Sequence, residues 1–300
     1  MPITSSCSEC ADKEAGVPRS KPSDDRPLRE QVIIEPSKRW VRISFTEIWR
    51  YRELVLFLAW RDIAVRYKQT AIGVLWAIIQ PLTAMVIFSI FFGRFARMPS
   101  EGSPYPVFTY AALLPWQYFG TAISEASQSM LTNERLLTKV YFPRLIIPVA
   151  SALPAAIDFA LSFLLFLGIM LAYGIPVTAR IIWLPLLLLL ALAMALGVGL
   201  WMSALNVQYR DFRYIVPFLV QIWMFASPVA YSLSIVPDRW RTLYSLNPMV
   251  TVIEGFRWAL LGSAGVSLAA VLASVVATAG MLFSGLAYFQ HVEDVFADVI

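Results

Sequence analysis

Long apolar runs, separated by short polar segments, dominate the chain from residue 71 onward. Apart from the fifth, each run has the roughly 20 residues, or nearly so, that a helix needs to cross about 30 Å of hydrocarbon. The pattern therefore predicts an all-α polytopic membrane protein with six transmembrane helices. The predicted spans lie at about residues 71–93, 107–124, 145–172, 181–205, 214–227 and 264–289.

A mixed pattern precedes the first run. In residues 45–68, apolar and aromatic side chains recur at helical spacing, and basic residues occupy many of the positions between them. The uncharged stretch 54–60 is far too short to span a bilayer, so we expect a helix that lies in the membrane interface. Residues 1–44 are polar and charged, which predicts a disordered cytoplasmic tail, and residues 293–300 form a short C-terminal tail.

The segment between the last two runs, residues 229–262, is too apolar for a simple loop and too interrupted for a span. Pro237 and Pro248 divide it. Backbone that enters the hydrocarbon without spanning it is tolerated only against protein or a water-filled path. We therefore expect a pair of short re-entrant helices that act as an outer gate. The charged residues of the segment are Asp238, Arg239, Arg241, Glu254 and Arg257.

Composition supports a membrane protein and charge gives its orientation. Hydrophobic residues make up 58% of the chain and charged residues 15%, against about 25% in soluble domains. With the N-terminus inside, the inner segments hold 18 Lys and Arg residues and the outer segments hold six. This asymmetry predicts that both termini are cytoplasmic. The net charge of +4 comes largely from the N-terminal part, and no nucleic-acid partner is expected.

The sequence does not contain a recognisable catalytic set. No G-x-x-x-x-G-K-[ST] motif for nucleotide phosphates is present. His291 is the only histidine and lies at the membrane edge of the last run, so no Ser/His/Asp set can be assembled, and a membrane enzyme such as a glycan acyltransferase is disfavoured. Cys7 and Cys10 have C-x-x-C spacing without the second pair that zinc needs, so free thiols are favoured over a redox or metal site. We expect no cofactor or metal on this chain.

Two features of the spans are open to more than one interpretation. Asp158 lies within an apolar run, where an acid is costly and faces protein or water. It is either an ion- or proton-coupling residue, an acid with a structural partner, or a neutral carboxylic acid. Aromatic residues of the outer half are either a membrane-interface belt or the lining of a sugar path, because aromatic faces stack on sugar rings. The path candidates are Trp116, Tyr118, Phe119, Trp223, Tyr231 and Trp240.

A short basic segment, residues 133–148, connects the second and third runs and belongs on the cytoplasmic side. It is either a topogenic loop or a short helix on which a partner acts. Together with four other blocks in order, it resembles the permease subunit of bacterial ABC-2 type exporters of O-antigen, capsule or teichoic acid, with the O-antigen branch nearest. The blocks are residues 50–81, LLPWQYFG at 113–120, NERLLTKVYFPRLIIP at 133–148, NVQYRDFRYIVP at 206–217 and NPMVTVIEGFRWALLG at 247–262.

The resemblance implies a transmembrane domain over residues 45–292, with an interface helix at 46–68, a coupling helix at 133–142 and gate helices at 229–261. It implies a homodimer of permeases with two separate ATPase subunits, which carry ATP and Mg²⁺ and drive a lipid-linked glycan across the inner membrane. The implied ATPase-coupling residues are Glu134, Arg135, Lys139, Tyr141, Arg210 and Asp211. The implied gate residues are Asn247, Pro248, Glu254 and Arg257.

Two other transport functions compete with this interpretation. A flippase or secondary transporter driven by an ion gradient usually has inverted repeats and more intramembrane charge than Asp158, and we find no repeat. An ABC-2 permease for a drug or another small molecule shares the same blocks. The aromatic residues of the outer half favour a glycan over such a substrate.

Overall fold

The computed structural model describes residues 49–68, 73–137, 139, 142–209, 211–263 and 265–293. Within these ranges the chain is helical and contains no strand. The predicted N-terminal tail, Tyr141, Arg210 and residues 294–300 lie outside the described residues.

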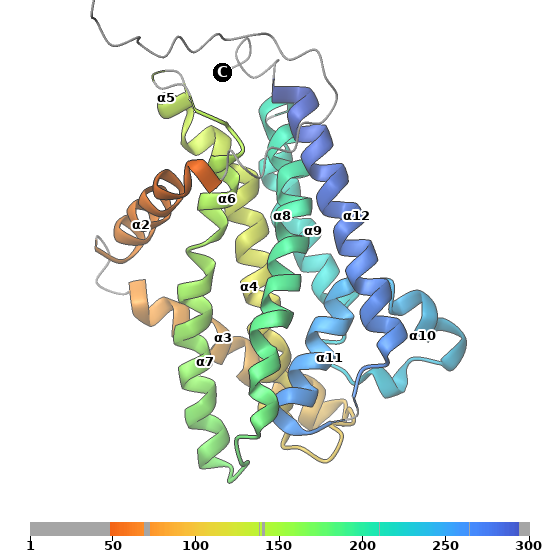
Figure 1. Cartoon of the computed structure of the whole chain (residues 1–300). Helices are drawn as coiled ribbons and strands as arrows, with labels where there is room; N and C mark the ends of the chain where they lie inside the picture. The colour runs from red at the N-terminus through yellow and green to blue at the C-terminus, as the bar shows by residue number, and fades with distance from the viewer. Residues whose placement is uncertain are drawn as a thin grey trace, which may run out of the picture. The chain divides into compact units, whose positions relative to one another are not determined.

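The helices follow the predicted runs in order (Figure 1). Two of them are continued or preceded by a different helical form: α3 continues as the π-helix η1, and α8 follows the 3₁₀ turn η2. The elements are α2 (Arg52–Lys68), α3 (Gly73–Phe88), η1 (Ser89–Phe95), α4 (Tyr105–Thr132), α5 (Glu134–Leu137), α6 (Ile146–Ala152), α7 (Ala155–Ala172), η2 (Ala179–Trp183), α8 (Leu184–Gln208), α9 (Phe212–Phe225), η3 (Leu233–Ile235), α10 (Asp238–Tyr244), α11 (Pro248–Leu261) and α12 (Leu268–Glu293).

Four helical stretches of the described chain are long and apolar enough to cross a membrane, at Leu75–Phe95, Ile146–Ala172, Ala179–Gln208 and Leu268–Glu293. The helix of the second predicted run, α4, is 28 residues long and more polar, because it carries several Ser, Thr and Gln residues and Glu125. The fifth, α9, is apolar but has only 14 residues. All six predicted runs are thus helical, and four of them have the length and composition of a span.

The centre of the bundle is formed by α4, α8 and α12. Helix α8 packs along both of the others, and small residues allow the close approach. A Cβ atom added at Gly285 of α12 would lie 2.3 Å from the carbonyl oxygen of Gly197, and one added at Gly199 would lie 2.7 Å from the Cβ of Ala126 on α4. Helices α3 and α9 lie at the margin, where many of their apolar side chains are exposed.

The third predicted span is interrupted. The expected run at residues 145–172 consists of α6 and α7, with a turn at Leu153 and Pro154 between them. Proline has no N–H to donate to the preceding turn, so the helical hydrogen-bond ladder is interrupted there, although Leu153 and Pro154 both keep helical dihedral angles. The two predicted outer helices are present as α10 and α11, at the opposite end of the bundle from α5 and the end of α12 (Figure 1).

Candidate functional site

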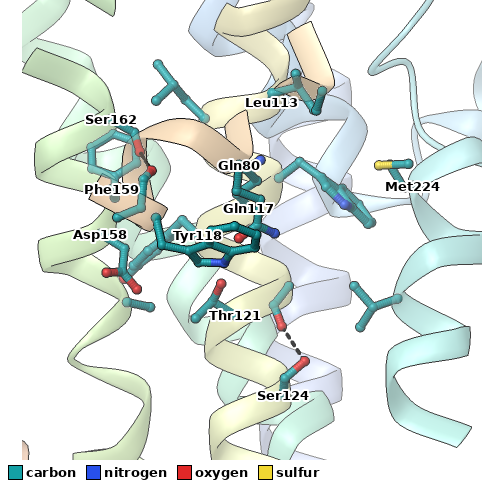
Figure 2. A pocket seen from close by; sticks show the side chains of 18 of the residues that line it. Gln80, Leu113, Gln117, Tyr118, Thr121, Ser124, Asp158, Phe159, Ser162 and Met224 are labelled. Atoms are coloured by element: carbon teal, nitrogen blue, oxygen red, sulfur yellow. Dashed lines mark hydrogen bonds between the residues drawn. The ribbon is translucent and has the colours of Figure 1, made fainter. Parts of the chain in front are cut away.

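A cavity of about 1030 Å³ lies between α3, α4, α7 and α9. Figure 2 shows side chains of α4, among them Gln117 and Thr121, between α7 and Met224 of α9. The cavity combines aromatic side chains, three glutamines, several hydroxyls and three charged residues. Its polar and aromatic lining consists of Arg66, Trp76, Gln80, Trp116, Gln117, Tyr118, Thr121, Ser124, Glu125, Asp158, Phe159, Ser162 and Gln221.

Helical periodicity places the lining residues on common faces. On α4, Leu113, Gln117, Thr121 and Ser124 follow one another at intervals of three or four, which puts them on one side of the helix. On α7, Asp158 and Ser162 share a face in the same way (Figure 2). These faces meet across the cavity, so residues that are far apart in the sequence contribute to the same lining.

A proline explains how α3 joins this site. Pro81 lies inside α3 and has no N–H, so the carbonyl of Ala77 lacks the usual helical hydrogen bond. The Ser162 hydroxyl of α7 donates to that carbonyl at 3.0 Å. In membrane helices, freed backbone groups are commonly satisfied by a Ser or Thr of a neighbour. The break in the α3 ladder therefore attaches α3 to α7 beside Gln80.

A charged cluster lies at one end of the cavity. Arg66, near the end of α2, donates from Nη1 to Asp158 Oδ2 at 2.6 Å and from Nη2 to Glu125 of α4. The Tyr67 hydroxyl donates to the other oxygen of Asp158. Burial, together with the hydrogen bond to Asp158, raises the pKa of Tyr67, so its phenol stays protonated at neutral pH. The cluster links the interface helix α2 to α4 and α7.

These contacts bear on the interpretation of Asp158. An acid inside an apolar run needs a partner, and Arg66 and Tyr67 both supply one. The arrangement supports a structural role for Asp158 over ion coupling.

The predicted coupling residues lie at the end of the bundle where α12 terminates (Figure 1). Glu134 and Arg135 are exposed on α5, which the structure describes only for Glu134–Leu137, and Lys139 and Asp211 are also exposed. The other two predicted residues, Tyr141 and Arg210, lie outside the described residues.

The coupling segment begins at an anchored asparagine. Asn133, the C-cap of α4, accepts a hydrogen bond from Arg61 of α2 at 2.6 Å and donates to the carbonyl of Ser129 at 2.9 Å. Farther along, Arg144 binds the backbone carbonyl of Glu293 at the end of α12, where a cation is favourable. The two ends of the segment are thus held by two different helices.

The predicted path residues separate into two groups. Trp116 and Tyr118 line the cavity described above, whereas Phe119 is fully buried and packs edge-to-face on Trp223 at 5.1 Å between centroids. The Trp223 indole donates to Asn247, whose side chain also caps α11 at Met249. A second cavity of about 720 Å³ is lined by Trp223, Trp240, Tyr244 and Asn247, among others.

The remaining gate residues form a buried polar connection. Arg257 of α11 is fully buried; it donates to Glu254 at 2.9 Å and to the backbone carbonyl of Val229 at 3.0 Å. Its guanidinium carbon lies 3.6 Å from the centre of the Phe108 ring of α4, a cation–π contact. The backbone carbonyl of Tyr231 accepts a further hydrogen bond from Arg257. The side-chain hydroxyl of Tyr231 forms a hydrogen bond with the hydroxyl of Tyr244.

Sequence reasoning missed several members of the site. The glutamines Gln80, Gln117 and Gln221 are isolated amides inside predicted apolar runs, and this was the available signal. The pairing of Arg66 with Glu125 joins residues 59 apart, and no local pattern indicates it. The described residues contain no group of three or more His, Cys, Asp or Glu placed to hold a metal ion.

The described chain combines four helical stretches of membrane-spanning length with a cavity that is lined by aromatic and polar side chains. The chain belongs to the ABC-2 type transporter family, whose profile matches residues 53–261. Members of this family are transporter permease subunits, which are not themselves catalytic.

Characterised relatives cover most of the chain. It is 30% identical over 213 residues to the O-antigen export system permease protein RfbA of Myxococcus xanthus, which covers 70% of this chain and 81% of the relative. A Klebsiella pneumoniae protein of the same name is 24% identical over 251 residues, 83% of this chain and 95% of the relative. The polysialic acid transport protein KpsM of Escherichia coli is 25% identical over 252 residues, which cover 83% of this chain and 96% of the relative.

Proposed function

We propose that this chain is the permease subunit of an ATP-driven exporter that moves a lipid-linked polysaccharide, of the O-antigen class, across the bacterial inner membrane. The observation that carries the proposal is the match to O-antigen export permeases over 213 and 251 residues. The match to the family profile runs from α2 to α11. The aromatic and amide lining of the cavity supports a sugar substrate. Both termini are cytoplasmic in this proposal.

The topology that goes with this function has six spans, formed by α3 with η1, α4, α6 with α7, α8, α9 and α12. Helices α10 and α11 then form a re-entrant outer gate. Charge supports the orientation, because exposed basic residues such as Arg135 of α5 and Lys139 beyond it belong at the cytoplasmic end. The burial of Arg257 and Glu254 against α4 supports an α11 that lies within protein rather than in lipid.

Energy comes from two partner ATPase subunits, which carry ATP and Mg²⁺, in this proposal. The exposed segment that includes Arg135 and Lys139 is the docking surface, with Asp211 beside it at the same end of the bundle. Its anchors on α2 and α12 give a partner a direct mechanical connection to the bundle.

A second copy of the permease completes the path. Helices α3 and α9 border the cavity and expose large apolar side chains, including Trp76 and Phe218. We propose that the two copies pair across this side, so that the path lies between them. Where the copies do not cover these surfaces, membrane lipids do.

The decisive experiment is purification of the detergent-solubilised permease, followed by an ATPase assay of what accompanies it. We expect a P-loop ATPase that lipid-linked glycan stimulates. A permease that purifies alone and moves substrate on an imposed ion gradient would overturn the proposal and would favour an ion-coupled transporter in which Asp158 is the coupling residue. If a small hydrophobic compound stimulates the co-purified ATPase and lipid-linked glycan does not, the result would favour a drug permease of the same family.

A further inference from the structure

We infer that the cavity between α3, α4, α7 and α9 is a subsite for uncharged sugar residues, which Gln80, Gln117 and Gln221 contact and from which Glu125 and Asp158 exclude acidic sugars. The inference rests on the proposed polysaccharide transport and specifies its substrate class. It concerns the charge of the glycan, a property in which polysaccharides exported by related permeases differ, since polysialic acid is an acidic polymer.

The three amides come from three different helices. Gln80 lies on α3, Gln117 on α4 and Gln221 on α9, and all three line the cavity. Their side chains make no hydrogen bond to any other residue that the structure describes. An amide offers both a donor and an acceptor, which matches a sugar hydroxyl that is itself both. Three such groups in a largely apolar wall are suited to hydroxyls of a ligand.

Aromatic faces complete the sugar-binding character of the wall. Trp76 on α3, Trp116 and Tyr118 on α4, and Phe159 on α7 line the same cavity as the amides. Ligand sites are commonly apolar walls in which a few placed polar groups determine specificity. Here those polar groups are neutral, apart from the cluster at one end.

The charge of the lining is unfavourable for an anion. Its charged side chains are Arg66, Glu125 and Asp158, so one positive and two negative charges give a formal net charge of −1. The guanidinium of Arg66 already donates to both acids. An incoming carboxylate or phosphate would therefore have to displace one of these acids from Arg66 and would face both. Like charges brought together at a binding surface are an effective way to reject a wrong partner.

The position of the acids makes the exclusion effective. Glu125 follows Thr121 and Ser124 on α4, and Asp158 lies one turn from Ser162 on α7 (Figure 2). The acids lie at the end of the cavity that faces α2, the predicted cytoplasmic interface helix. A glycan that enters from this end passes the acids before it reaches Gln117 and Gln80.

The test is protection of a single cysteine in the full-length permease, purified with its ATPase. Thr121→Cys is introduced into a Cys7→Ser, Cys10→Ser background, and its alkylation rate is measured with maltohexaose as the neutral probe and a sialic acid hexamer as the acidic probe. At about four times its Kd, maltohexaose leaves roughly a fifth of the sites free and slows alkylation about fivefold. The sialic acid hexamer has no effect. Thr178→Cys, exposed in the loop before η2, is the matched control that neither probe protects.

Charge variants determine whether the acids are responsible. Glu125→Gln combined with Asp158→Asn changes the formal charge to +1, and the acidic hexamer then protects the introduced cysteine as maltohexaose does. If the double variant does not insert, Glu125→Gln alone gives a charge of zero and partial protection. Arg66→Gln gives −2 and keeps the preference for the neutral probe.

Two results would overturn the inference. One is equal protection by both probes in the unmodified cavity, and the other is protection by neither. Each leaves the proposed export function intact if the co-purified ATPase still responds to lipid-linked glycan, so failure of the inference and failure of the proposed function are distinguishable.

Discussion

Arg66 and Asp158, which are 92 residues apart in the sequence, form an ion pair at 2.6 Å between α2, the predicted interface helix, and α7. Both side chains are about a quarter exposed, at 29% and 25%. The pair gives the acid in the third apolar run a fixed partner. It also connects a helix outside the spans to the cavity between them.

We expect Asp158→Asn to leave export largely intact, because the amide oxygen still accepts from Arg66 and the amide NH2 can donate to the Tyr67 hydroxyl, which accepts as well as donates. Arg66→Ala is expected to destabilise more, by about 1–3 kcal/mol, since it leaves two acids facing each other without a cation. Thermal unfolding of the detergent-solubilised protein and an export assay measure the two effects. Abolished export with normal assembly in Asp158→Asn would restore the ion-coupling interpretation.

Charge reversal at Arg135 and Lys139 is expected to uncouple ATP hydrolysis from export while the protein still inserts. Both residues are exposed at the predicted cytoplasmic end, and reversal inverts the charge that this segment presents to the proposed partner. The measurements are export, ATPase activity and the amount of co-purified ATPase. The matched control is charge reversal at Arg94, which lies in η1, and at Arg97, which follows it. Normal export by the Arg135 and Lys139 variant would remove this segment from the coupling surface.

The hydrogen bond from Ser162 to the carbonyl of Ala77 can be tested with a double-mutant cycle. Ser162→Ala should cost about 1–3 kcal/mol, because it leaves a backbone carbonyl without a partner. Pro81→Ala restores a backbone N–H that can donate to the Ala77 carbonyl. Ser162→Ala should therefore lower the free energy of unfolding clearly less in that background. The unfolding temperatures of the unmodified protein, the two single variants and the double variant give the coupling energy between Ser162 and Pro81. Equal costs in both backgrounds would contradict the assigned role of Pro81.

The contact between α8 and α12 predicts opposite results for two glycines on one helix. A Cβ at Gly285 would lie 2.3 Å from the Gly197 carbonyl oxygen, whereas one at Gly280 would meet nothing within 4 Å. Gly285→Ala is therefore expected to destabilise by about 1–3 kcal/mol. Gly280→Ala should be neutral or slightly stabilising, because alanine has the higher helix propensity. Similar unfolding temperatures for the two variants would show that α8 and α12 are not in close contact.

The helical class of the fold could be predicted from the apolar runs, because a segment in lipid must satisfy its own backbone. The predicted ends of the helices were less accurate. The run at 107–124 gave no indication that α4 extends to Thr132, because the later turns of α4 are polar yet buried against other helices. The break between α6 and α7 had a visible cause in Pro154, but proline is tolerated in some spanning helices and so was not decisive.

The candidate site was predictable only in part. Trp116 and Tyr118 were chosen for their chemistry and do line the cavity, whereas Phe119, chosen on the same grounds, is fully buried in the core. Adjacent residues on a helix point in different directions, so a cluster in the sequence is not a cluster in space. Contacts such as Arg61 with Asn133 depend on tertiary packing. The roles of Tyr141 and Arg210 stay predictions.

The buried Arg257 has a consequence for how the outer end would open. Helix α11 is held to α4 through Phe108 and to the chain at Val229, so it forms part of the fixed frame of the bundle. Helix α10 has an exposed surface and is attached by lighter contacts, such as that between Tyr231 and Tyr244. In the proposed gate, opening would then move the short helix α10 while α11 stays in place. The energetic cost would lie in breaking part-buried contacts, such as that between the Tyr231 and Tyr244 hydroxyls, rather than in exposing a desolvated cation.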